Sequence, residues 1–235
     1  MNEKILASAI LIDRKIPWLR RVAICVCSPV GSLRFRLAYR NACRRDYVQL
    51  HVGAGLYRLE GWLNTDVLPF APLYLDATRR FPIRDNSVSY IFSEHFIEHV
   101  PRRAATKFLE ESFRVLRVGG ILRTTTPDVE AVARAYVERS KCVQLLNERN
   151  RQLGKKHSTY PVDILNKVFF DDRHVCLYDE QTLGQLLRSA GFQNITRCKV
   201  GESHHAGLSG IEQHDPSIED EFTCVLEATK PPSEG

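Results

Sequence analysis

The stretch that decides the fold is VQLHVGAG, Val48–Gly55, a short apolar run that ends in Gly-Ala-Gly. Two carboxylates follow it, Asp66 and Asp76, and each ends a further short apolar run. This order predicts a strand, a glycine turn that lets a ligand approach the backbone, and acidic side chains that accept hydrogen bonds from hydroxyls or an exocyclic amine. The function of the chain therefore depends on what this turn binds.

After Tyr47 the chain alternates between strand-like and helix-like segments. Apolar runs predict strands within residues 47–52, 61–66, 73–76, 88–93, 121–126, 194–200 and 222–228. The last two are expected to form an antiparallel pair. Strands that alternate with helices are typical of a largely parallel sheet that is covered on both faces.

Three helices are predicted between these strands by apolar spacing and by their ends. The first begins at Pro101 and is expected to stop at Gly119-Gly120. The second and third are capped by Asp128 and Asp179, whose side chains suit the first turn of a helix. Gly191 is expected to end the third helix.

The first 45 residues differ from the rest, because they are rich in arginine and apolar residues. Pro29-Val30-Gly31 is expected to split this segment, with Ser32 capping a helix that runs to about Cys43. A basic stretch that contains Trp18 suits an anionic membrane surface. A helical extension packed on the main domain is the alternative, and the weak apolar periodicity favours it. The predicted domains are a basic helical extension, residues 1–45, and a main domain, residues 46–235.

Composition sets broad limits on the function. A chain of 235 residues can form one sizeable α/β domain, and its net charge of +5 permits an anionic substrate or membrane surface without requiring either. The seven cysteines form no C-x-x-C pair, which favours a reducing compartment and no metal site. No apolar run approaches the ~20 residues that a membrane span needs. A cytoplasmic protein, with membrane association as an option, is expected.

The glycine turn does not suit a dinucleotide. The dinucleotide fingerprint G-x-G-x-x-G uses its third glycine for close packing of the helix that follows. Here Gly53-Ala54-Gly55 is followed by Leu56-Tyr57-Arg58, and the third glycine is missing. NAD and FAD are therefore disfavoured.

Ordered motifs from residue 47 to about residue 230 carry a family resemblance. They are VQLHVGAG with Asp66, LDATRRFPIRDNSVSYIFSEHFIEHV (Leu75–Val100), FLEESFRVLRVGGILRTTTPD (Phe108–Asp128) and YDEQTLGQLLRSAGF (Tyr178–Phe192). In this order they resemble class I S-adenosylmethionine-dependent methyltransferases, in particular the small bacterial methyltransferase type 11-like family. The resemblance implies a Rossmann-like α/β fold, with a mostly parallel seven-stranded sheet, helices on both faces and an antiparallel strand near the C-terminus.

The resemblance also implies S-adenosyl-L-methionine as the cofactor. The backbone of the glycine turn would contact the methionine part, Asp66 the ribose hydroxyls and Asp76 the adenine amine, with the Ala77 N–H on the ring. The cofactor-binding candidates are His51, Gly53, Ala54, Gly55, Asp66, Val67, Asp76, Ala77 and Ser93. Only a short turn fits between Gly55 and Asp66, so this chain is expected to lack the long first helix of most methyltransferases.

The catalytic candidates are His95 and Glu94, which follow the strand at 88–93. His95 is a candidate general base for an oxygen nucleophile, because imidazole titrates near working pH. A structural histidine at the strand end is an equal alternative. Glu94 suits the methionine amine or the substrate, and a solvated carboxylate is its alternative. Glu98 and His99 are expected to tie a short helix to the sheet.

The substrate candidates lie mainly in the second half of the chain: Asp128, His157, Tyr160 and His174. Residues 147–157 form a polar segment that is expected to be a mobile loop over the substrate. His204, His205 and His214 stand near Glu202 and Asp215, but their spacing matches no common ligand set, so no metal is expected.

These observations predict S-adenosylmethionine-dependent methyl transfer, with O-methylation of a small-molecule or saccharide-type acceptor. The saccharide depends only on the resemblance to bacterial types linked with surface polysaccharides. A non-catalytic binding module is disfavoured by the intact glycine turn and carboxylates. A nucleic-acid methyltransferase is disfavoured because Ser93-Glu94-His95-Phe96 replaces the N/D-P-P-Y/F tetrapeptide of amino-methylating DNA enzymes.

Overall fold

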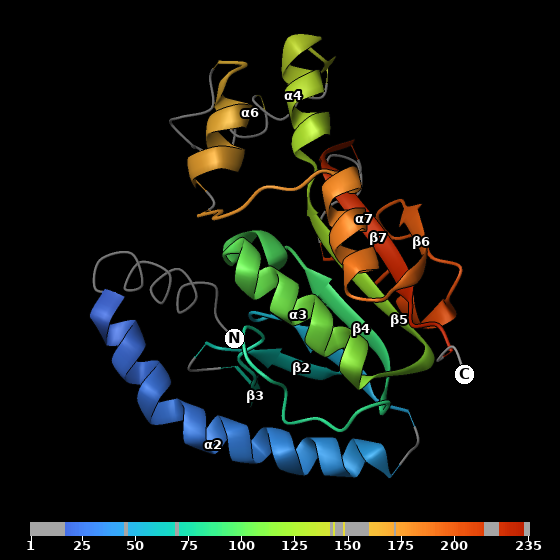
Figure 1. Cartoon of the computed structure of the whole chain (residues 1–235). Helices are drawn as coiled ribbons and strands as arrows, with labels where there is room; N and C mark the ends of the chain where they lie inside the picture. The colour runs from blue at the N-terminus through green and yellow to red at the C-terminus, as the bar shows by residue number, and fades with distance from the viewer. Residues whose placement is uncertain are drawn as a thin grey trace.

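A seven-stranded sheet with the order β3-β2-β1-β4-β5-β7-β6 forms the centre of the computed structural model (Figure 1). The strands are β1 (Gln49–Val52), β2 (Leu63–Asp66), β3 (Leu73–Tyr74), β4 (Val88–Glu94), β5 (Leu116–Pro127), β6 (Gln193–Cys198) and β7 (Thr223–Thr229). The strands from β3 to β5 pair in parallel, whereas β7 runs antiparallel to both β5 and β6. The predicted fold class and the antiparallel last pair are confirmed.

The structure describes residues 17–44, 47–68, 71–141, 143, 148, 160–171, 173–213 and 221–232. Its helices are α2 (Pro17–Cys43), α3 (Arg102–Val115), α4 (Val129–Val137), α6 (Asp163–Asn166) and α7 (Glu180–Ser189), with short turns η1 (Ile97–His99), η2 (Lys167–Asp171) and η3 (Ala206–Leu208). None of the described helices combines the length and the apolar character needed to cross a bilayer. The predicted loop at 147–157, apart from residue 148, lies outside the described residues.

The core lies between the central strands and α3, which crosses in front of the sheet in Figure 1. Leu50 in β1 and Ile91 in β4 are fully buried, as expected for strands that are covered on both faces. Phe108 and Leu109 of α3 are also fully buried, since the predicted apolar face of this helix points to the sheet. The central strands and this helix thus hold the carboxyl ends of β1 and β4 in fixed positions.

The helix caps are confirmed where the sequence predicted them. The Asp128 carboxylate accepts hydrogen bonds from the Glu130 and Ala131 backbone at 3.2 and 3.3 Å, which starts α4. Asp179 accepts one from the Thr182 backbone at 2.7 Å and starts α7. Gly191 follows α7 with φ +102°, the left-handed conformation that suits glycine after a helix.

The predicted end of the first core helix at Gly119-Gly120 is wrong. The helix α3 ends at Val115, and both glycines lie within β5. The pairing of β4 with β5 shifts register between Val88 and Tyr90, opposite this part of β5. Gly119 has φ +74°, so the glycines serve an irregularity of the strand and not a helix end.

The predicted split of the N-terminal segment at Pro29-Val30-Gly31 is also wrong. The helix α2 continues through Pro29 to Cys43, so Ser32 lies inside it, and Figure 1 shows the helix bending along its length. A proline inside a helix removes one hydrogen bond and bends the axis without having to end it. A Cβ added to Gly31 would lie 2.6 Å from the Tyr74 Cβ, so this glycine lets α2 approach β3 closely.

Candidate cofactor site and active site

The glycine turn after β1 has the backbone that the sequence predicted. Gly53 and Gly55 have φ values of +70° and +55°, in the left-handed region that favours glycine. A Cβ added to Gly53 would lie 3.0 Å from the Phe96 side chain, whereas one added to Gly55 would meet nothing within 4 Å. The Ala54 N–H donates to the Thr65 carbonyl at 3.0 Å. The turn is therefore anchored to β2 and open beside Gly55.

Asp66 lies at the end of β2, directly against this turn. Its Oδ2 accepts a hydrogen bond from the Gly55 N–H, and its Oδ1 accepts one from the Leu68 N–H, both at 2.9 Å. A carboxylate has about four lone-pair positions, so both oxygens can accept further bonds from ligand hydroxyls. Val67 follows as a half-buried residue.

Asp76 comes just after β3 and is held in a tight turn. Its Oδ1 accepts from the Thr78 N–H at 3.0 Å and from the Thr78 hydroxyl at 2.6 Å. Its Oδ2 lies 3.0 Å from the Arg79 Nε, but the Arg79 side chain is 81% exposed, so this pair contributes little stability. Ala77 is buried beside it.

Two other cofactor candidates make their contacts inside the sheet. His51 is buried, with its Nδ1 3.1 Å from the Asn64 Oδ1, and burial lowers its pKa below the ordinary value. The Ser93 hydroxyl lies 2.9 Å from the Thr124 hydroxyl and is also buried. Both side chains support the strands beneath the turn, and their contact with the cofactor stays a prediction.

Strand register brings the ends of β1, β2 and β4 together. Val52 pairs with Thr65 of β2 on one side and with Ser93 of β4 on the other. The glycine turn, Asp66 and the residues after Ser93 therefore lie at one edge of the sheet, where ligands of open α/β sheets bind. Glu94 ends β4, and its carboxylate accepts from the Gln213 N–H at 3.0 and 3.2 Å, which ties this edge to the late loop.

His95 forms a pair with Glu98 that was not predicted from the sequence. The His95 Nδ1 lies 2.8 Å from the Glu98 Oε1, and the Thr126 hydroxyl donates to the Glu98 Oε2 at 3.1 Å. Glu98 is fully buried. Burial raises the pKa of Glu98, but the hydrogen bond and charge of His95 outweigh that effect and hold the pKa below its usual range. The carboxylate is therefore ionised, and it accepts a hydrogen bond from the protonated Nδ1 of His95.

The expected structural role of Glu98 is present as well. Its backbone carbonyl accepts hydrogen bonds from the Val175 N–H at 2.7 Å and from the Cys176 N–H at 3.1 Å. These bonds fasten η1 to the segment before α7. A local pattern such as S-E-H-x-x-E-H indicates that His95 and Glu98 can meet on one turn, but nothing local indicates the distant segment.

The substrate candidates have different surroundings. Asp128 is buried, caps α4 and lies 2.7 Å from the Arg197 Nη1, so its carboxylate is used by the fold. His174 stacks edge-on with His99, with ring centroids 5.1 Å apart. Tyr160 is 69% exposed. His157 lies outside the described residues.

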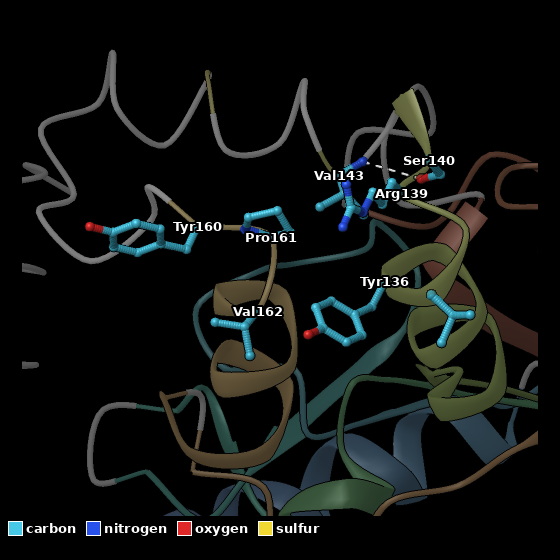
Figure 2. Close-up of a pocket in the computed structure, with 8 residues that line it drawn as sticks. Tyr136, Arg139, Ser140, Val143, Tyr160, Pro161 and Val162 are labelled. Carbon is cyan, nitrogen blue, oxygen red and sulfur yellow. Dashed lines mark hydrogen bonds between the residues drawn. The ribbon is translucent and has the colours of Figure 1, made fainter.

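Tyr160 lines a pocket of about 680 Å³ between α4 and the chain that leads into α6 (Figure 2). The other lining residues are Tyr136, Val137, Arg139, Ser140, Val143, Pro161 and Val162. Apolar and aromatic side chains dominate this pocket, which suits part of an organic acceptor. Contact of Tyr160 with a substrate stays a prediction.

Comparison with known proteins supports one class. Residues 56–124, from just after the glycine turn into β5, match the profile of a family described as methyltransferase domain. No curated protein matches the sequence significantly.

Solved structures with a similar chain path include a methyltransferase from Thermotoga maritima, described as S-adenosylmethionine-dependent and a possible histamine N-methyltransferase. Its identity is 20% over 93% of this chain and 97% of that one, with a TM-score of 0.49. A methyltransferase from Archaeoglobus fulgidus is 13% identical over 94% of this chain and 99% of that one, with a TM-score of 0.48. Phosphoethanolamine N-methyltransferase 2 of Haemonchus contortus is 15% identical over 79% of this chain and 49% of that one, with a TM-score of 0.48.

The sheet order and the glycine turn with its two carboxylates agree with the predicted class I methyltransferase fold, and residues 56–124 match a methyltransferase domain. Both findings support the prediction of an S-adenosylmethionine-dependent methyltransferase, with S-adenosylmethionine as the cofactor. The described residues fit this molecule, because the open space at Gly55 admits a ligand and Asp66 and Asp76 offer acceptors for hydroxyl and amine donors.

Proposed function

We propose that the protein methylates a hydroxyl group of a small-molecule or saccharide-type acceptor, with His95 as the general base. The observation that carries this proposal is the 2.8 Å contact between the His95 Nδ1 and the fully buried Glu98 carboxylate. The saccharide-type acceptor is supported only by the resemblance to the small bacterial family. A cytoplasmic location stays a prediction.

The pair suits removal of a hydroxyl proton. Because Glu98 accepts from Nδ1, the neutral ring of His95 carries its lone pair on Nε2, which is the atom that would take the proton. The imidazolium that results lies beside a carboxylate, which stabilises the new positive charge. A positioned base of this kind typically contributes about 10²–10⁴-fold in rate.

The remaining residues bind and position. When bound, S-adenosylmethionine supplies an electrophilic methyl group on a sulfonium. The backbone of Gly53–Gly55, with Asp66 and Asp76, would hold this cofactor at the carboxyl ends of the strands. Since a positive charge is lost from the sulfonium in the reaction, the site needs orientation and exclusion of water more than strong acid catalysis.

The test is a transfer assay with radiolabelled S-adenosylmethionine on a panel of sugars, phenols and primary amines. Label is expected on at least one hydroxyl compound. The variant His95→Ala is expected to lower kcat by about 10²–10⁴-fold, with affinity for S-adenosylhomocysteine unchanged in calorimetry. The control is His204→Ala, which removes an exposed histidine of the late loop and should retain full activity.

Two results would refute the proposal. Transfer to amines alone would show that the acceptor is not a hydroxyl. Full kcat in His95→Ala would show that another group takes the proton. Failure to bind either form of the cofactor at millimolar concentration would contradict the site itself.

A further inference from the structure

We propose that Glu98, His99 and His174 form a binding site for one divalent transition-metal ion. A ligand atom from each of the three side chains lies within 4.8 Å of the other two. Nothing local in the sequence groups these three residues, since His174 is far from the other two along the chain. The proposal concerns metal binding alone and does not depend on the acceptor proposed above.

The fold assembles this cluster with backbone hydrogen bonds. Glu98 and His99 are consecutive in η1, and His174 precedes the two residues whose N–H groups bind the Glu98 carbonyl at 2.7 and 3.1 Å. Because these bonds join backbone groups, they hold the two segments together independently of the side chains. The three ligand groups are therefore brought together before any ion arrives.

Hydrogen bonds also orient the ligand atoms. The His174 Nδ1 lies 2.6 Å from the Val168 carbonyl oxygen. A carbonyl oxygen only accepts, so Nδ1 carries the proton and Nε2 has the free lone pair. Metal-binding histidines typically donate their second ring nitrogen to a carbonyl or carboxylate in this way.

Glu98 is oriented by two partners. His95 binds its Oε1 and Thr126 binds its Oε2, and each carboxylate oxygen retains a further lone pair. In the proposed site His95 would be an outer partner of the coordinating carboxylate. Because Glu98 is fully buried and His99 is exposed, an ion would lie at the rim of the protein with access from solvent.

The ligand types select the kind of ion. Two imidazoles and one carboxylate suit Zn²⁺, Co²⁺, Ni²⁺ or Fe²⁺, whereas Ca²⁺ and Mg²⁺ prefer oxygen ligands. Ligand atoms ~2.0–2.2 Å from one zinc ion lie ~3–4 Å from one another, so small side-chain rotations would complete the site. Three protein ligands leave a coordination position open, as in sites where a metal holds water or an oxygen ligand.

The experiment uses the full chain without S-adenosylmethionine. ZnCl₂ is titrated by calorimetry, and CoCl₂ binding is followed by the visible absorption of the ion. Wild type is expected to bind one ion per chain, with a raised Tm in zinc. The double variant His99→Ala/His174→Ala should lose at least ten-fold in affinity and most of the Tm shift.

The matched control is the double variant His204→Ala/His205→Ala, which removes two histidines from the late loop and should bind zinc as wild type does. Circular dichroism without metal checks that both variants fold, and the single variant His99→Gln serves if the double variant does not. Unchanged zinc affinity in the folded His99 variants would overturn the proposal. A thiolate charge-transfer band of cobalt would likewise overturn it, since the ion would then be on cysteines.

Discussion

Asp76 and Glu98 have comparable chemistry but different expected roles in ligand binding. Asp76 is half-buried after β3, whereas Glu98 is fully buried against His95. We expect Asp76→Ala to weaken S-adenosylhomocysteine binding by at least ten-fold, because an acceptor for the adenine amine is lost. Glu98→Gln should leave this affinity within about two-fold while lowering kcat.

Calorimetry of the two variants tests this difference, with a transfer assay for kcat. An equal loss of cofactor affinity in both variants would contradict the assignment of Asp76 as the acceptor for the adenine amine. Restoration of kcat by Glu98→Asp, at unchanged cofactor affinity, would support a positioning role of the carboxylate over a purely structural one.

Gly53 offers a test of the turn itself. Gly53→Ala places a Cβ 3.0 Å from the Phe96 ring and forces alanine to φ +70°. The left-handed conformation alone costs about 1–2 kcal/mol. We expect a lower Tm and weaker cofactor binding, measured by thermal melts and calorimetry. Gly210→Ala is the control, because it has φ +68° with nothing within 4 Å, and it should lower the Tm without affecting the cofactor.

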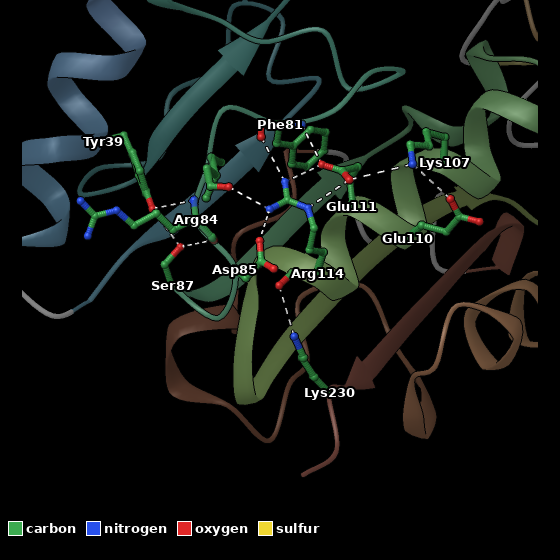
Figure 3. A network of polar contacts seen from close by, with 11 residues as sticks. Tyr39, Phe81, Arg84, Asp85, Ser87, Lys107, Glu110, Glu111, Arg114 and Lys230 are labelled. Atoms are coloured by element: carbon green, nitrogen blue, oxygen red, sulfur yellow. Dashed lines mark hydrogen bonds and ion pairs between the residues drawn. The ribbon is translucent and has the colours of Figure 1, made fainter. Parts of the chain in front are cut away.

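A network of charged groups fastens α3 to residues 81–85 (Figure 3). The Arg114 guanidinium donates to Glu111 at 2.6 and 3.1 Å and to the Phe81 and Ile83 carbonyls at 3.1 and 2.9 Å. The Phe81 N–H donates to Glu111 in turn at 2.8 Å. Truncating one member of such a pair leaves the other charge poorly solvated, so Arg114→Met should destabilise the fold by about 3 kcal/mol.

Urea unfolding monitored by circular dichroism measures this loss. Arg134→Met is the control, because Arg134 pairs with Glu130 on the surface of α4, with both side chains 63% exposed. It should cost less than about 1 kcal/mol. A loss of similar size in both variants would contradict the importance of the network around Arg114.

The same network should make the stability of the fold depend on pH through Glu111. Burial raises the pKa of Glu111, but the Arg114 hydrogen bond and the Phe81 N–H outweigh it and hold the pKa below its ordinary value. A depressed pKa in the folded state contributes stability above the unfolded pKa, and that contribution is lost as the pH falls through the folded pKa. Glu111→Gln should therefore unfold at lower urea than wild type at pH 7, with a smaller difference below pH ~4.

Local signals predicted the helices of the core well. The caps Asp128 and Asp179 and the apolar face of α3 depend on neighbours a few residues apart, so the sequence contains them. The Gly119-Gly120 pair was misplaced because a glycine signal fits a helix end and a strand irregularity equally. The cluster around Glu98 could not be predicted, since it needs a contact between η1 and His174 that only the tertiary fold provides.

The exposed face of α2 supports the prediction of peripheral membrane contact. Val30, Leu33 and Leu37 are 61%, 59% and 53% exposed and recur at helical spacing. Arg34, Arg36 and Arg40 are exposed beside them, and α2 contains no acidic residue. Charge complementarity points to an anionic bilayer as the partner of this face.

Sedimentation with vesicles tests this partner. Wild type should bind vesicles that contain phosphatidylserine, bind phosphatidylcholine vesicles less, and be released by salt. Leu33→Asp/Leu37→Asp should abolish binding, whereas Val137→Asp, at a 77% exposed valine of α4, should not. Equal binding to both kinds of vesicle, or none to either, would refute the prediction. The division of the chain at residue 45 stays a prediction.

The close contact of Gly31 with Tyr74 also bears on how copies of this protein avoid one another. Unpaired outer strands of a sheet are templates for aggregation between chains. On one side the outer strand β3 has only two residues and lies against α2. On the other side β6 is irregular in its pairing and carries Arg197, which is bonded to Asp128 and Glu180. Both edges of the sheet are therefore poor templates for pairing with a second copy of the chain, and the small Gly31 permits the close cover on the β3 side.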